Sequence, residues 1–184
     1  MDRKMKASHR MRFLMASIAA MIGVSLALAS SVTPTYAAKT TSVEATILFS
    51  GPPPTMLPAG DDETHFAGLG KRTGKATFSD GRKAEYSNVF FMDWYRGKSM
   101  FLWGYTKMVF QNGSWMYFKW DSQFAGRDEA GGAMFKGTGT ILKGVGQYEG
   151  ITGTVKFHNR QLPPSEEYPK GTREAKAVFT YTLP

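Results

Sequence analysis

The 184-residue chain contains no cysteine, which excludes disulfides, thiolate metal sites and a lipid-modified cysteine behind a leader. Histidine is scarce too, with three residues in the whole chain. The sequence also lacks a serine nucleophile elbow, a phosphate loop that opens a helix, and a paired-histidine metal motif. These absences argue against hydrolases and nucleotide-binding proteins, and they leave packing as the source of stability.

Positive charge is concentrated at the start of the chain, whose net charge is +8. Five cations in the first twelve residues (Arg3, Lys4, Lys6, Arg10 and Arg12) face one anion, Asp2, so +4 belongs there and +4 to the remainder. The later cations are interspersed with Asp and Glu, whereas nucleic-acid-binding domains usually gather them on one face or in one run. We therefore expect no nucleic-acid partner.

An apolar run from Phe13 to Ala29 follows the early cations, and polar residues and Pro34 end it. This order is typical of a secretory signal peptide, with a small-residue cleavage site after Ala37. The alternative is an uncleaved anchor, because the run is at the lower length limit for spanning a bilayer.

The sequence thus predicts a signal peptide at 1–37 and a mature domain at 38–184. We expect the protein to be exported, to the periplasm or the extracellular space. Nothing after residue 40 resembles a second apolar span, so we expect no stable membrane insertion after cleavage.

Alternating apolar and polar residues, rich in β-branched and aromatic types, predict strands through most of the mature domain. Asn112-Gly113 is the strongest hairpin signal, since a type I′ turn needs positive φ at both central residues. The proline-rich segment 52–64 is predicted to be a long loop. No helical periodicity follows residue 40. The predicted strands are near 42–49, 70–78, 83–94, 98–111, 114–124, 133–142, 151–160 and 175–183. Seven or eight antiparallel strands predict an all-β closed barrel or a sandwich.

A glycine-rich segment runs through residues 137–157, and its part Gly146-Gln147-Tyr148-Glu149-Gly150-Ile151-Thr152-Gly153 predicts a tight corner anchored by Tyr148. This part resembles the G-x-[YF]-x-G-[AI]-x-G hairpin of the allene oxide cyclase-like and dirigent group of calycin-like barrels. The resemblance implies a single antiparallel closed barrel of about eight strands with an apolar cavity, often in oligomers. It also implies binding or steering of small hydrophobic molecules, sometimes with cyclase activity. No catalytic residue of that group matches a position here.

Aromatic residues are concentrated between Tyr86 and Trp120, and both faces of the predicted strand 98–111 are largely apolar. A sheet with one solvated face would not show this pattern, so a loop, a partner subunit or a ligand should cover the second face. In one interpretation the aromatic residues form the core and an oligomer interface. In another they line a cavity for an apolar or aromatic molecule, and in a third exposed Trp side chains stack on sugars. The residues predicted to line such a cavity are Tyr86, Trp94, Trp103, Tyr105, Trp115 and Tyr117.

Candidates for acid-base chemistry are few. Asp93 and Asp121 lie among aromatics at predicted strand ends, where apolar walls can raise a carboxyl pKa, and His158 lies on a predicted strand. His65 follows Asp61-Asp62-Glu63, which is typical either of a solvated loop or of a metal or His-carboxylate site. Solvated positions are the plainer interpretation for all of them, and we expect neither metal nor cofactor.

Three functions follow as hypotheses. The first is an exported β-barrel protein that binds a small hydrophobic or aromatic molecule in its cavity. The second is a cofactor-independent cyclase or isomerase on the same barrel, with Asp93, Asp121 or His158 as acid-base groups. The third is a structural or interaction protein whose aromatic sheet forms a homo-oligomer.

Overall fold

A computed structural model describes residues 39–184, so the predicted signal peptide and its cleavage site lie outside the described residues. The described chain consists of strands and one short 3-10 turn. The strands are β1 (Thr40–Ser50), β2 (Thr55–Pro58), β3 (His65–Phe78), β4 (Lys83–Tyr95), β5 (Ser99–Phe110), β6 (Trp115–Arg127), β7 (Ala133–Val145), β8 (Thr152–Gln161) and β9 (Arg173–Thr182); the turn is η1 (Gly146–Tyr148).

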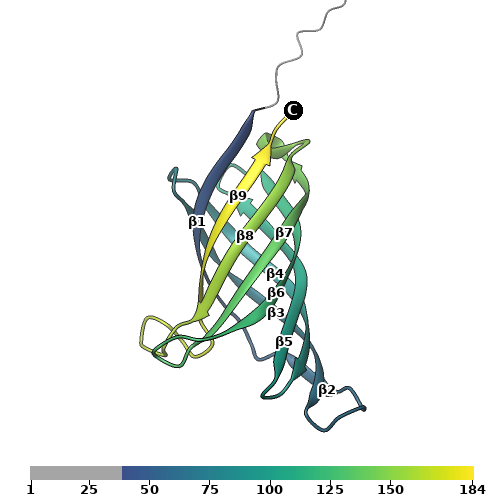
Figure 1. Ribbon diagram of the computed structural model, residues 1–184. Helices are drawn as coiled ribbons and strands as arrows, with labels where there is room; N and C mark the ends of the chain where they lie inside the picture. Colours follow the sequence, from purple (N-terminus) through teal and green to yellow (C-terminus); the bar gives the residue numbers. More distant parts are fainter. Residues whose placement is uncertain (1–38) are drawn as a thin grey trace, which may run out of the picture. The chain divides into compact units, whose positions relative to one another are not determined.

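Neighbouring strands pair antiparallel in the order β1-β9-β8-β7-β6-β5-β4-β3-β2, and an additional pairing of β1 with β3 closes the sheet (Figure 1). Within the described residues eight strands therefore form the barrel, and the short β2 pairs with β3 at its edge. Closure leaves the eight barrel strands without an open edge. The predicted all-β fold and closed antiparallel barrel are confirmed.

The glycine hairpins form where the sequence predicts them, but the β5–β6 turn has Gln111 and Asn112 at its centre rather than Asn112 and Gly113. Gly113 has φ of 80°, and its N–H donates to the carbonyl of Phe110 at 2.9 Å, closing the β5–β6 hairpin. At the predicted barrel corner, Gly146 and Gly150 have φ of 68° and 72° and flank Tyr148, whose side chain is 1 % exposed. Tyr148 is thus the buried anchor that the glycine motif predicts.

The predicted long loop at 52–64 is wrong in part, because it contains β2 and because β3 begins at His65 rather than near Gly70. Two neighbours extend β3: its first residues pair with β2 on one side and with the end of β4 on the other, where His65 lies opposite Tyr95. Pro58 is tolerated because it ends the short edge strand. These segments form the tip that projects beside β2 in Figure 1.

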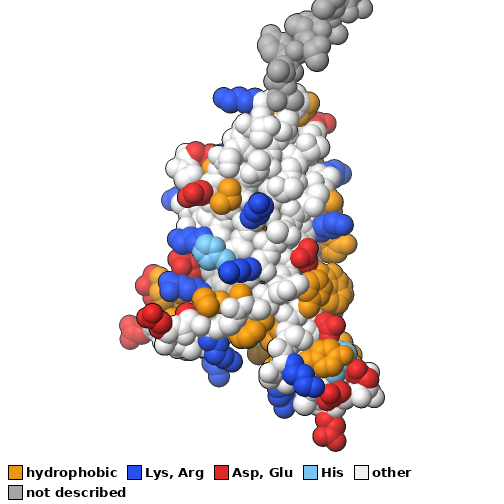
Figure 2. Space-filling model, in the orientation of Figure 1, with side chains coloured by type: hydrophobic (Ala, Val, Ile, Leu, Met, Phe, Trp, Pro, Cys, Tyr) orange, Lys and Arg blue, Asp and Glu red, His pale blue; other side chains and the backbone are white. Residues whose placement is uncertain are grey.

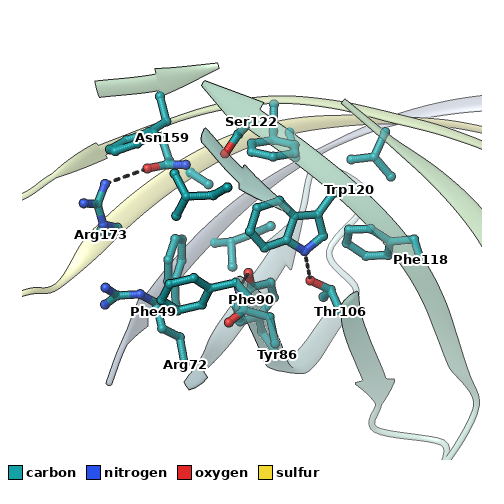
Figure 3. Close-up of a pocket in the computed structure, with 18 of the residues that line it drawn as sticks. Phe49, Arg72, Tyr86, Phe90, Thr106, Phe118, Trp120, Ser122, Asn159 and Arg173 are labelled. Carbon is teal, nitrogen blue, oxygen red and sulfur yellow. Dashed lines mark hydrogen bonds between the residues drawn. The ribbon is translucent and has the colours of Figure 1, made fainter. Parts of the chain in front are cut away.

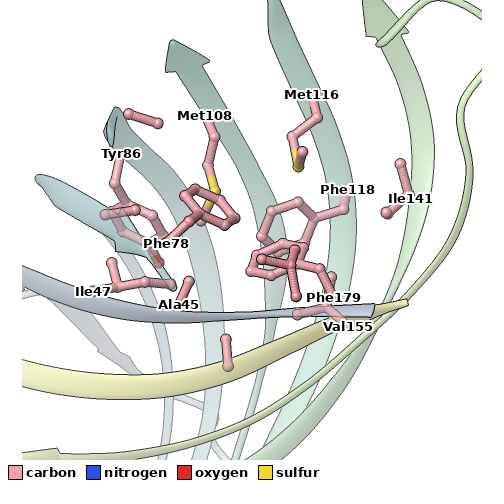
Figure 4. Packing of buried hydrophobic residues seen from close by; sticks show 14 of the residues in the cluster. Ala45, Ile47, Phe78, Tyr86, Met108, Met116, Phe118, Ile141, Val155 and Phe179 are labelled. Atoms are coloured by element: carbon pink, nitrogen blue, oxygen red, sulfur yellow. The ribbon is translucent and has the colours of Figure 1, made fainter. Parts of the chain in front are cut away.

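One half of the barrel interior is packed solid, and we call it the closed half. It lies at the end of the barrel where the β3–β4 and β5–β6 turns are. Large side chains from several strands fill it, including Phe78, Met108 and Met116 (Figure 4). Arg82 caps this end: its guanidinium lies over the Phe78 ring at 5.2 Å and donates to the hydroxyls of Tyr148 and Tyr181.

Candidate functional site

The other half of the barrel, which we call the hollow half, contains a cavity of about 230 Å³. It lies where β1 ends and β9 begins, and apolar side chains from most of the strands form its walls (Figure 3). The apolar lining includes Phe49, Phe90, Leu102, Phe118, Phe157 and Phe179. A concave, mostly apolar site with a few polar groups is the usual form of a small-molecule site.

The cavity stays open because several inward-facing positions carry small side chains. Ala175 and Ala177 of β9 and Ser122 of β6 are buried and line the space. In the closed half the same strands carry larger residues, for example Tyr181 on β9 and Met116 on β6. Inward and outward positions therefore alternate in the same way in both halves. The size of the inward side chains decides which half is hollow.

A row of polar residues crosses the wall. In the strand register Arg72 of β3 lies opposite Asn88 of β4, which in turn lies opposite Thr106 of β5. Thr106 accepts a hydrogen bond from the indole N–H of Trp120 at 3.0 Å, and Asn88 donates to the hydroxyl oxygen of Tyr86 at 2.5 Å. Burial raises the pKa of Tyr86 to about 12, so its hydroxyl stays neutral.

One polar atom in this row has no partner. Among the described residues, the Oδ1 atom of Asn88 is buried and accepts no hydrogen bond. Leaving such an acceptor unpaired costs about 1–3 kcal/mol. The atom is therefore available to an O–H or N–H donor of a bound molecule.

Two arginines, Arg72 and Arg173, lie on the same side of the cavity (Figure 3). Arg72 donates to the carbonyl of Gly171 at 3.3 Å, and Arg173 donates to Asn159 Oδ1 at 3.0 Å. Burial lowers the pKa of both guanidinium groups, and the charge of Arg72 also acts on Arg173, whose pKa falls to about 10. Both arginines still carry a charge at neutral pH.

Of the six aromatic residues predicted to line the barrel cavity, only Tyr86 lines the cavity of the hollow half. Trp94 lies near the end of β4, where it packs against Phe66 with ring centroids 6.0 Å apart. The other four lie on the outer surface: Trp103 and Tyr105 are 41 % and 42 % exposed, and Trp115 and Tyr117 are half-buried. The predicted cavity lining is thus corrected at five positions.

The correction follows from strand alternation. Both faces of β5 are apolar, and the inward face carries Leu102, Thr106 and Met108 rather than the aromatic set. The outward aromatics instead stack on one another, with Trp103 on Phe91 at 5.5 Å and Tyr105 on Tyr117 at 5.7 Å. They form an outer aromatic face across β4, β5 and β6.

The three acid-base candidates do not line the cavity either. Asp121 and His158 are exposed on the outer surface of β6 and β8, and Asp93 lies near the end of β4. Asp93 accepts a hydrogen bond from His65 Nε2 at 2.7 Å. The candidates are therefore not gathered around one space.

His65 lies at the projecting tip between two carboxylates. Its Nδ1 is 2.5 Å from Asp61 Oδ1, its Nε2 is 2.7 Å from Asp93 Oδ1, and its ring stacks on Tyr95 at 3.8 Å. Desolvation opposes the charged imidazole, but the hydrogen bonds to Asp61 and Asp93 prevail and raise its pKa. In Figure 2 acidic and histidine side chains gather at this tip.

Residues 39–184 contain no group of three His, Cys, Asp or Glu side chains arranged to hold a metal ion. The same part of the chain has no helix with the length and apolar character needed to cross a membrane.

Sequence reasoning missed the polar cavity residues, although a signal for them was present. Counting back in steps of two from the apolar positions Phe78 and Phe179 keeps to the inward face and reaches Arg72 and Arg173. The missed residues are Arg72, Asn88, Thr106, Trp120, Ser122, Asn159 and Arg173.

Comparison with known proteins gives little at the sequence level: no family model and no curated protein matches the chain. Among solved structures, a pterocarpan synthase dirigent protein is similar, with a TM-score of 0.48 and 14 % sequence identity. The match covers 85 % of this chain and 98 % of that chain. At this level of similarity no residue role transfers, and the barrel assignment rests on the strand pairing described above.

Proposed function

We propose that the domain is an exported β-barrel protein that binds a small, largely hydrophobic molecule in the hollow half of the barrel. The observation that carries this proposal is the cavity itself, about 230 Å³ of space behind apolar walls with a short row of polar groups. Burying apolar ligand surface there supplies the affinity, at roughly 25 cal/mol per Å² before the costs of ordering. Export rests on the leader pattern of residues 1–37.

The polar row supplies orientation rather than affinity. Asn88 Oδ1 is free to accept one donor from the ligand, while Tyr86, Thr106 and Trp120 already bond to one another or to Asn88. A ligand with a single hydroxyl or amine placed next to Asn88 Oδ1 donates the hydrogen bond that this buried acceptor lacks. A purely hydrocarbon ligand leaves it unpaired, at a cost of about 1–3 kcal/mol.

The test is a titration of the mature domain with N-phenylnaphthylamine, a neutral apolar dye whose emission rises in apolar surroundings. Wild-type protein is expected to bind the dye, and Ala177→Phe, which fills the cavity, is expected to weaken binding by roughly tenfold or more. Ser122→Leu fills the space from another strand and serves if Ala177→Phe does not fold.

The matched control is Trp103→Ala, which removes an aromatic side chain from the outer aromatic face. It should leave dye binding unchanged, because Trp103 does not line the cavity. Equal binding by wild type and both filled variants, or loss of binding only in the Trp103 variant, contradicts the proposal.

A further inference from the structure

The two arginines in the hollow half are partly buried, and neither has the anionic partner that such arginines normally have. Their hydrogen bonds go to neutral acceptors, the Gly171 carbonyl and the Asn159 side chain. Their guanidinium carbons lie over aromatic rings, that of Arg72 5.4 Å from the Phe90 centroid and that of Arg173 4.7 Å from the Phe135 centroid. Among the described residues, no Asp or Glu lines the cavity with them.

The strand register explains why the two charges lie on the same side. On β1, Phe49 pairs with Arg173 of β9, and the next residue, Ser50, pairs with Thr73 of β3. Arg72 and Arg173 thus flank the end of β1 from its two neighbouring strands. Burial, and after it the positive charge of Arg72, lowers the pKa of Arg173. Two like charges at one side of an apolar space repel each other and have lost hydration, and neutral hydrogen bonds offset this only in part.

The closed half shows what a compensated arginine looks like in the same barrel. Arg82 Nη2 lies 2.5 Å from Asp80 Oδ2, and Arg82 also donates to two tyrosine hydroxyls. These partners, led by the Asp80 carboxylate, raise the pKa of Arg82 above its ordinary value. The contrast is one of partners, because both guanidinium environments include aromatic rings.

We propose that the cavity ligand is an amphipathic anion, whose carboxylate, sulfonate or phosphate group is held by Arg72 and Arg173 while its apolar body fills the cavity. This inference rests on the proposed function and specifies its ligand class. Guanidinium groups donate in a planar fork that matches such anions, and the resulting charge-assisted bonds are about twice as strong as neutral ones. The anion also supplies the negative charge that the protein does not place there.

The test uses two probes of the same shape, naphthoate and its neutral amide naphthamide, in competition with the neutral dye N-phenylnaphthylamine. Wild-type protein is expected to bind naphthoate more tightly than naphthamide by roughly tenfold or more, the gain of one charge-assisted pair. Arg72→Gln and Arg173→Gln are each expected to remove most of this preference while changing naphthamide affinity by less than about twofold. Arg173→Lys, which keeps the charge but not the fork, should retain part of it.

Lys107→Gln is the matched control, since Lys107 is an exposed cation on the outer surface, with its ammonium 4.8 Å from the Trp115 ring centroid. It removes the same formal charge and should leave both affinities unchanged. A preference lost equally in Lys107→Gln indicates long-range attraction and overturns the arginine assignment. Thermal unfolding of each variant confirms that it is folded at the assay temperature.

The outcomes separate this inference from the function it rests on. If the dye binds but naphthoate competes no better than naphthamide, the anion assignment is wrong and the apolar site stands. If the dye itself fails to bind wild-type protein, the proposed function fails and the ligand class fails with it.

Discussion

The two halves of the barrel interior are built from the same strands yet differ in packing and in charge. In the closed half, Phe78, Met108 and Met116 leave no space, and Arg82 has a carboxylate partner in Asp80. In the hollow half, small side chains leave a cavity, and Arg72 and Arg173 have only neutral acceptors. The closed half is complete without a ligand, whereas the hollow half has space and uncompensated charge together.

The difference distinguishes residues that stabilise the fold from residues that we propose bind a ligand. A cation that has an anionic partner and lies among closely packed side chains stabilises the fold, so removing it lowers the free energy of unfolding. A partly desolvated cation without such a partner lowers stability instead. In this barrel the second kind of arginine occurs beside the cavity, so we assign it to the ligand.

The largest expected effect concerns packing. Phe78→Ala in the closed half should lower the free energy of unfolding by about 3–5 kcal/mol, because the cavity it creates cannot collapse. Phe157→Ala in the hollow half should cost less, about 1–2 kcal/mol, because one side of this ring already faces empty space. Urea unfolding followed by circular dichroism measures both. Equal losses would contradict the division into two halves.

The next effect concerns charge, and its sign differs between the halves. Arg82→Met should destabilise the protein by about 2 kcal/mol, since Asp80 and two tyrosine hydroxyls lose their donor. In ligand-free protein, Arg173→Met should stabilise it by about 1 kcal/mol, because a desolvated cation is replaced by an apolar side chain of similar length. Thermal unfolding of both variants measures these changes in stability. A change of the same sign in both variants would contradict the claimed difference between the two halves.

A smaller effect on stability is expected for side chains on the outer face of the barrel. Trp103→Ala removes a side chain that is 41 % exposed and stacks on Phe91, so it should change stability by less than about 1 kcal/mol. Inward-facing Phe110→Ala, on the same strand β5, should cost several times more because Phe110 is 5 % exposed and packs in the closed half. A larger loss for Trp103→Ala would show that the outer aromatic face is part of the stabilising structure.

The smallest effect extends the comparison to the tip. His65 has two carboxylate partners, and its pKa is raised in the folded protein. The two hydrogen bonds from the His65 ring to the carboxylates, which we call the clamp, therefore stabilise the tip fully below pH about 6.5, the pKa of histidine in the unfolded chain. This stabilisation is lost as the pH rises through the raised pKa of the folded protein. An NMR titration of the His65 ring should show the raised pKa, and Asp61→Asn should lower it. An unchanged pKa in that variant would contradict the clamp.

Much of the fold could be predicted from the sequence because its signals are local. Alternation gave most strands, and Asn112-Gly113 and the Gly146–Gly153 segment gave two turns that the structure contains. The early part of β3 was missed because it depends on pairing with β2 and with the end of β4, which are not local in sequence. The loop prediction at 52–64 is wrong only at Thr55–Pro58, for the same reason.

The site could be predicted less well, because alternation shows two faces without showing which face is inside. Both faces of β5 are apolar, so the aromatic face was assigned inward although Trp103 and Tyr105 lie outside. Alternation along β3 and β9 places Arg72 and Arg173 on the inward face, but their lying on the same side of the cavity became recognisable only when β9 and β3 were found on either side of β1. Barrel closure brings residues 101 positions apart in sequence to one side of the cavity, which no local pattern indicates.

The most direct test of the account is native mass spectrometry of the mature domain, expressed with its leader, purified without detergent and compared with the Arg72→Gln/Arg173→Gln double variant. The account predicts a bound small molecule in the wild type that leaves on denaturation, ionises as an anion and is absent or strongly depleted in the double variant. A wild-type barrel that carries no small molecule, or one retained equally by the double variant, would contradict the claim that the unpartnered arginines mark a ligand site.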